Sequence, residues 1–211
     1  MKYVARCKVV TDIGPHASYI LGTITAPSLQ SFTIETAGYS RFEPMPAVGS
    51  SLLSGIKGFF EHSKFRLRRF SLCGVLCSTQ DLLHILEIMS ELRELVLHEV
   101  PPLGLSEVYD HCPNELVTTE LIKSLTIDLN GDVLLPQLQN LELRILQGWE
   151  HDVFERMLES RCGHGLTSVY VAGARRTPLE REDFLVDIEK LGKIDLAVRV
   201  PKILEYEVIE R

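Results

Sequence analysis

The amino-acid sequence predicts an α/β fold, in which a curved, mainly parallel sheet carries helices on its convex face. The first observation is a recurring pattern, Leu-x-x-Leu-x-Leu, whose last two apolar residues share one face of a strand. The second is that helix-capping signals stand between successive copies of the pattern, which favours parallel crossover connections. This pattern is the strand signature of a leucine-rich repeat. We therefore expect one leucine-rich-repeat solenoid domain over residues 1–211.

The copies of the pattern set the expected strand positions. The central copy is Leu138-x-x-Leu141-x-Leu143, and a further segment, 194–200, alternates apolar and other residues. Three of the five spacings between first positions lie within the roughly 20–29 residues of a leucine-rich repeat, and the other two require insertions or a degenerate repeat. The expected strands lie near residues 29–35, 67–73, 92–98, 138–144, 166–171 and 194–200.

The first half of the chain adds an edge strand, a loop and two helices. Residues 3–10 alternate weakly, which predicts an edge strand beginning the sheet, and residues 37–50 are a long loop. Ser50 or Ser51 caps a helix that runs to about residue 62. Ser78, with an acidic residue three positions later, resembles a capping box and starts the strongest helix, which ends by residue 90.

The second half predicts three more helices. After an irregular segment at 101–117, Thr118 or Thr119 caps a short helix over 120–125. A helix over 149–161 ends at two glycines, and a last helix spans 182–191.

Composition limits the classes of partner. The net charge of −7 and the isoelectric point near 5.5 argue against nucleic-acid binding, so we expect none. The chain contains no apolar run near the ~20 residues of a membrane span, and we expect no membrane partner. Five cysteines without framework spacing predict a reduced intracellular compartment, cytoplasmic or nuclear.

Candidate chemistry is sparse. His111-Cys112 and Cys162-x-His164 are the notable Cys/His pairs, but their separation of about 50 residues matches no standard zinc motif. Cys73-x-x-x-Cys77 is interpreted as packing, and no nucleophile elbow or phosphate-binding glycine pattern occurs. We therefore expect no catalytic residue, no metal and no cofactor. The alternative is a hydrolase or metal-dependent enzyme of unrecognised type.

The strand pattern also predicts a binding face. If the leucines point to the core, the intervening residues line the concave side, through which repeat proteins characteristically bind. Arg144 and Tyr170 are expected on adjacent strands, as one anchor pair. The predicted partner-binding residues are Arg69, Glu94, His98, Glu142, Arg144, Tyr170 and Arg199.

The order of motifs resembles a known family. It runs from Thr25-Ala26-Pro27-Ser28-Leu29 through Leu67-Arg68-Arg69-Phe70 and a helix beginning Asp81-Leu82-Leu83, to Leu134-Leu135-Pro136-Gln137-Leu138 and Met157-Leu158-Glu159-Ser160-Arg161. Over about residues 20–200 it is similar to the C-terminal repeat region of the fungal F-box/leucine-rich-repeat proteins. The resemblance implies repeats that recognise substrates for a cullin-RING ubiquitin ligase.

In that family an N-terminal F-box helix bundle docks the ligase adaptor. This chain lacks a Leu-Pro-x-Glu-like helical opening before its repeats. We therefore expect the 211-residue chain itself not to bind the adaptor, and expect adaptor and cullin as partners only if an F-box is present elsewhere.

Overall fold

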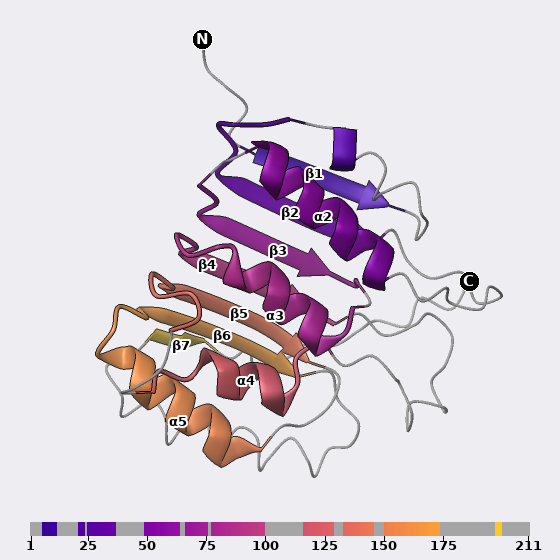
Figure 1. Ribbon diagram of the computed structural model, residues 1–211. Coiled ribbons are helices and arrows are strands. Elements are labelled where there is room, and N and C mark those ends of the chain that lie inside the picture. The colour runs from indigo at the N-terminus through magenta and orange to yellow at the C-terminus, as the bar shows by residue number, and fades with distance from the viewer. Residues whose placement is uncertain are drawn as a thin grey trace, which may run out of the picture.

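The fold is an α/β arrangement built on one parallel sheet. A computed structural model of the chain describes residues 6–11, 21–23, 25–36, 49–63, 66–75, 77–99, 116–128, 133–145, 150–173 and 197–199. Within them, seven strands lie in chain order from β1 to β7, and each neighbouring pair is parallel. Figure 1 shows this sequential order of strands, with helices between them along the chain. The predicted α/β class and parallel sheet are confirmed.

Each strand overlaps the position predicted for it. They are β1 (Arg6–Thr11), β2 (Ser31–Thr36), β3 (Arg69–Cys73), β4 (Glu94–His98), β5 (Asn140–Ile145), β6 (Ser168–Gly173) and β7 (Ala197–Arg199). β1, the edge strand expected from the weak alternation over residues 3–10, pairs with β2 at one side of the sheet.

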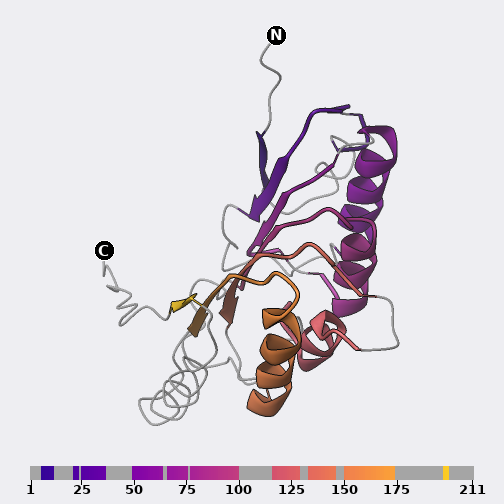
Figure 2. The same cartoon turned by 90° about the vertical axis from the view of Figure 1, so that its left-hand side faces the viewer.

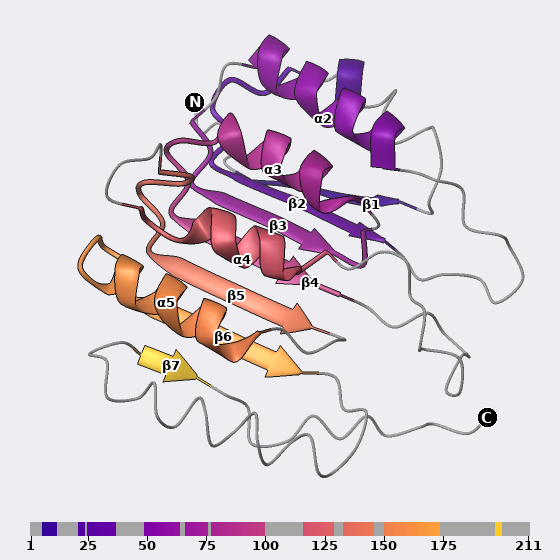
Figure 3. The same cartoon turned by 60° about the horizontal axis from the view of Figure 1, so that its bottom comes forward.

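Four helices lie on a single face of the sheet. They are α2 (Gly49–Ser63), α3 (Thr79–Glu87), α4 (Thr119–Leu125) and α5 (His151–Cys162). Figure 2 shows them on one side of the strands, and Figure 3 shows them in rows over the sheet. None of the helices in the described ranges is long and apolar enough to cross a bilayer. The opposite face of the sheet, which these helices leave uncovered, is called the open face below.

In three copies of the pattern, the first leucine lies at the end of a turn rather than in the strand itself. The amide of Leu92 donates to the Met89 carbonyl at 2.9 Å, and the amide of Leu138 donates to the Leu135 carbonyl at 3.1 Å. Leu29 makes the same contact with Ala26 at 3.1 Å. The observed strands therefore begin about two residues later than predicted, because the turn holds the leucine side chain in the core before the ladder starts.

A repeated backbone contact follows each of these turns. The carbonyl of Arg68 accepts the amides of two consecutive residues, Arg93 and Glu94, each at 2.9 Å. The carbonyls of Gln30, Arg93 and Gln139 accept two consecutive amides from the next strand in the same way. Four equivalent contacts at four equivalent positions mean that successive strands start with the same geometry.

The starts of α3 and α4 follow the predicted capping residues, whereas α2 begins at Gly49 and so includes Ser50 and Ser51, which were predicted to cap it. The Ser78 hydroxyl accepts the Asp81 amide at 3.1 Å, and the Thr118 hydroxyl accepts the Leu121 amide at 3.2 Å. After α5 the chain turns at Gly165, whose φ of 98° lies in the left-handed region that favours glycine. The predicted helix over 182–191 and most of the predicted loops at 37–50 and 101–117 lie outside the described residues.

The core fills the space between sheet and helices. On β2, Phe32 packs against Phe59 of α2, with ring centroids 5.2 Å apart, and against Phe70 of β3 at 6.2 Å. Leu141 and Leu143 of β5 are also fully buried, as their place in the pattern predicts. Each repeat therefore contributes its strand leucines to one continuous apolar layer.

Candidate functional site

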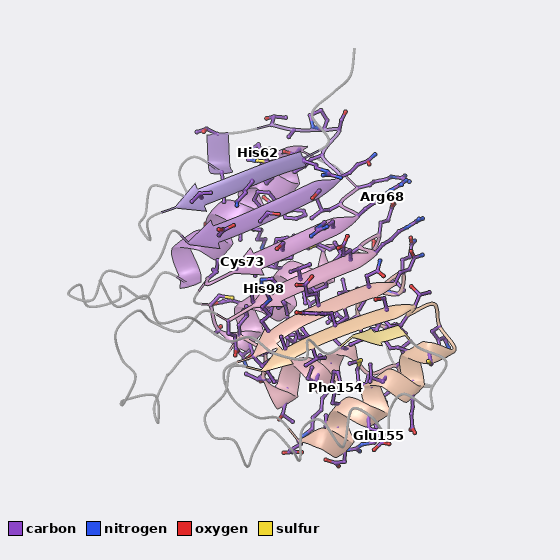
Figure 4. All side chains as sticks on the ribbon, turned by 180° about the vertical axis from the view of Figure 1, so that it is seen from behind. His62, Arg68, Cys73, His98, Phe154 and Glu155 are labelled. Atoms are coloured by element: carbon purple, nitrogen blue, oxygen red, sulfur yellow. The ribbon has the colours of Figure 1, made fainter. Side chains whose placement is uncertain are left out.

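Alternation along the strands separates the core from the open face. On β5, residues 141, 143 and 145 are buried, whereas Asn140, Glu142 and Arg144 are only half-buried. Because successive side chains of a strand point to opposite faces, these three side chains lie on the open face. Figure 4 shows that face, with the sheet in front of the helices.

Ion pairs join neighbouring strands across the open face. Lys8 of β1 contacts Glu35 of β2, with 2.6 Å between Nζ and Oε2. Arg69 of β3 contacts Glu94 of β4, with 3.0 Å between Nη1 and Oε1. Both predicted residues of the second pair are therefore brought together. These partly exposed pairs contribute little to stability, so their side chains remain available for a partner.

A third polar group lies across β4 and β5. The Nε2 atom of His98 is 2.7 Å from Oε1 of Glu142, and Arg144 Nε is 3.9 Å from the same oxygen. Within the described part of the chain, Arg144 Nε is the one buried side-chain nitrogen or oxygen atom without a hydrogen-bond partner. The structure thus brings together three residues that the sequence placed on this face.

The contacts within this group shift the pKa values of His98 and Glu142. The hydrogen bond from His98 lowers the pKa of Glu142 against the opposing effect of burial, and the charges of His98, Arg144 and Arg69 lower it further. Burial acts to lower the pKa of His98, but its hydrogen bonds with Cys73 and Glu142 outweigh burial and raise that pKa. The His98–Glu142 contact therefore favours an imidazolium beside a carboxylate.

Cys73 completes this cluster from the neighbouring strand. Its Sγ atom is 3.5 Å from Nδ1 of His98 and 3.5 Å from Oγ of Ser71. Figure 4 labels Cys73 and His98 close together near the ends of β3 and β4. The interpretation of Cys73 as a packing residue is incomplete, because its side chain is partly exposed and contacts the polar side chains of Ser71 and His98.

The sequence carried a signal for this pairing. Cys73 follows the last leucine of its repeat, as His98 does in the next one, and the two residues pair in the parallel register. Equivalent repeat positions on adjacent strands lie side by side, so reading down that column finds the pair.

Two side chains of the open face are shielded from water. Ser71 is 4% exposed and Val96 is 2% exposed, although strand alternation places both on the predicted concave side. They pair in register at the middle of β3 and β4, between the longer side chains of Arg69 and His98. Small side chains flanked by long ones are shielded from water, so the centre of these two strands offers little contact area.

The remaining predicted residues lie on the last strands. Tyr170 of β6 is half-buried and pairs in register with Glu142, while Arg144 pairs with Ala172. Arg144 and Tyr170 are thus diagonal neighbours on adjacent strands, where the sequence predicted them to lie. The backbone of Arg199 pairs with Tyr170 on β7, and its side chain lies outside the described residues.

Of the two cysteine and histidine pairs weighed for zinc, Cys162 and His164 lie within the described residues. Cys162 ends α5 half-buried, and His164 is exposed, with Nδ1 2.8 Å from the Ser160 carbonyl. His111 and Cys112 lie outside the described residues. Over the described ranges, three or more His, Cys, Asp or Glu side chains nowhere gather in a metal-binding arrangement.

The open face presents charged and aromatic side chains from six adjacent strands, β1 to β6, with the His98 cluster near its centre. No family model, no curated protein and no solved structure matches this chain.

Proposed function

We propose that this chain is a non-catalytic protein–protein interaction module, a leucine-rich-repeat solenoid that binds its partner on the open, concave face. The repeated backbone contact at the start of β3, β4, β5 and β6 supports the solenoid, because identical joints between successive units are what a repeat architecture requires. The sequential parallel order of the strands supports it as well.

One observation carries the binding proposal: partly exposed charged and aromatic side chains occupy the face that the helices leave uncovered. Arg69, Arg144 and Tyr170 belong to residue types that often anchor interfaces. Positive and negative groups alternate from strand to strand, as in the Lys8–Glu35 and Arg69–Glu94 pairs. Such a surface suits a protein with complementary mixed charges better than it suits a uniformly charged nucleic acid.

The resemblance to fungal F-box/leucine-rich-repeat proteins extends the proposal. In this extended form, the module recognises substrates of a cullin-RING ubiquitin ligase inside the cell. Adaptor and cullin join the complex only through an F-box supplied elsewhere. Size-exclusion chromatography of the purified 211-residue chain with the adaptor tests this, and co-elution would show that the chain makes the adaptor contact itself.

Affinity capture with paired variants tests the binding face. R144A/Y170A removes the anchor pair, whereas K123A/E155A changes two exposed residues on α4 and α5 and serves as the matched control. We expect the first variant to bind the natural partner at least about tenfold more weakly, since two anchor residues each contribute more than about 1 kcal/mol. The control should bind as wild type does.

Thermal melts of both variants establish that each is folded. Unchanged partner binding by folded R144A/Y170A, together with a loss of binding in K123A/E155A, would move the interface to the helical face.

A further inference from the structure

Three successive strands bring a thiol, an imidazole and a carboxylate into contact. Cys73 at the end of β3 is in register with His98 at the end of β4, and Glu142 of β5 is the diagonal neighbour of His98, in register with Val96. The two ring nitrogens of His98 have different partners: Nδ1 lies 3.5 Å from Sγ, and Nε2 lies 2.7 Å from Oε1. A carboxylate that holds one nitrogen of an imidazole orients the other nitrogen toward the thiol.

This arrangement favours the thiolate form of Cys73. Burial acts to raise the pKa of Cys73, but the hydrogen bonds from His98 and Ser71, together with the charge of His98, outweigh burial and lower it. Glu35, which pairs with Cys73 from β2, opposes that effect.

A second cysteine in the same segment provides the contrast. Cys77 is buried among apolar residues and lacks such a partner in the described contacts, and burial raises its pKa to about 12. The pKa values of two cysteines four residues apart are therefore shifted in opposite directions. The thiolate is the nucleophilic form, so reactivity belongs to Cys73.

We propose that Cys73 is a reactive thiol that hydroperoxides oxidise to a sulfenic acid, with His98 as its proton donor and Glu142 as the residue that positions His98. Cys73 is partly exposed on the open face, where a small peroxide molecule can approach it. The site is distinct in chemistry from the proposed protein-binding role of the same face and does not depend on it.

The reaction balances with the groups present and one peroxide. The Cys73 thiolate attacks one oxygen of hydrogen peroxide, an S–O bond forms and the O–O bond breaks. Sulfur is oxidised by two electrons and the peroxide is reduced. The leaving hydroxide takes the proton of the His98 imidazolium and becomes water, which leaves a cysteine sulfenic acid and a neutral imidazole.

The backbone around Cys73 favours a single modification of its thiol over repeated catalysis of acyl transfer. Acyl transfer needs free amide donors near the nucleophile, which form an oxyanion hole. The amide after Cys73, that of Gly74, instead donates to the His98 carbonyl at 2.8 Å. It is committed to the sheet, so the thiol is equipped to react but not to stabilise a tetrahedral intermediate.

Residue-resolved alkylation with iodoacetamide, read by mass spectrometry, measures the nucleophilicity. At pH 7 we expect Cys73 to react at least about tenfold faster than Cys77. H98Q should slow the reaction of Cys73 by roughly tenfold, while H84Q, on the exposed side of α3, should leave it unchanged. Equal rates for Cys73 and Cys77 in the wild-type chain would overturn the proposal, as would an unchanged Cys73 rate in folded H98Q.

The pH dependence of Cys73 alkylation in the wild-type chain tests the proposal without any variant. The Cys73 rate should reach half its maximum below the ordinary thiol value of about 8.5. A midpoint at or above that value would contradict a stabilised thiolate.

Treatment with hydrogen peroxide followed by dimedone identifies the product. We expect a dimedone adduct on Cys73 in the wild-type chain and a strongly reduced one in H98Q. Rapid alkylation of Cys73 without a dimedone adduct would overturn the assignment to hydroperoxides.

Discussion

At the scale of single residues, position along a strand decides whether a side chain supports the fold or faces outward. Leu141 and Glu142 are neighbours on β5, yet Leu141 is 1% exposed in the core and Glu142 belongs to the polar cluster of the open face. One residue of register separates the two roles, because the side-chain period of a strand is two.

Truncation of Leu141 should strongly destabilise the protein. L141A removes a fully buried side chain from the middle of the sheet and leaves a cavity, so we expect a loss of about 2–5 kcal/mol in the free energy of unfolding. Urea denaturation followed by circular dichroism measures it. E155A on α5, an exposed position, is the control and should change stability by less than about 0.5 kcal/mol. A wild-type melting curve for L141A would show that Leu141 does not belong to the core.

The coupling between His98 and Glu142 should depend on pH. Because the pKa of His98 is raised in the folded protein, the stability that His98 contributes is fully present below its ordinary pKa of 6.5. This stability is lost as pH rises through the folded-state pKa. Because the pKa of Glu142 is lowered in the folded protein, the stability that Glu142 contributes is fully present above its ordinary pKa of 4.5. This stability is lost as pH falls through the folded-state pKa. The coupling is therefore largest at about pH 5–6.5.

A double-mutant cycle with H98Q and E142Q measures this coupling from unfolding free energies. We expect about 1 kcal/mol at pH 6 and a clearly smaller value at pH 9. Cys73 and Arg144 also face His98 and are present in all four proteins of the cycle. Coupling of equal size at both pH values would contradict a charged His98–Glu142 pair.

At the scale of elements, one buried cation joins two helices and a turn. Arg161, near the end of α5, donates to the carbonyls of Leu125, Leu134 and Leu135, the last at 2.9 Å. Leu125 ends α4, whose last carbonyls lack helical partners, so a cation there also complements the helix dipole. Burial lowers the pKa of Arg161 to about 10, so the guanidinium keeps its charge at neutral pH.

Removal of the Arg161 guanidinium should destabilise the packing of α4, α5 and the turn at residues 134–135. R161M keeps much of the apolar stem but leaves three carbonyls without their donor, and we expect a loss on the order of 3–5 kcal/mol. R156M removes an exposed arginine from the same helix, where it pairs with Asp152, and should cost less than about 1 kcal/mol. Equal melting temperatures for R161M and R156M would contradict the structural role of Arg161.

At the scale of the whole molecule, local patterns predicted the framework but not the contacts between repeats. The leucine pattern located strands such as β3 and β5, and capping residues located the starts of α3 and α4. These signals are local, since each depends on residues a few positions apart.

Contacts between distant residues needed the structure. Arg161 reads in the sequence as the charged end of a helix, and its burial depends on carbonyls 26 to 36 positions away. The Cys73–His98 contact likewise depends on register across 25 positions, which the spacing of the repeats implies only when the two strands are aligned. The shielding of Val96 depends on its neighbours on other strands, and in its own segment only its apolar side chain, between two leucines, indicates it.

The central proposal is that the open face binds a protein, and site-specific photo-cross-linking tests it most directly. The photoreactive amino acid p-benzoylphenylalanine replaces Tyr170 on the open face of β6 in one variant and Glu155 on the exposed side of α5, on the helical side of the sheet, in another. After irradiation in cells, we expect a covalent adduct with the partner from position 170 and none from position 155. Adducts from position 155 with none from position 170 would contradict binding through the open face.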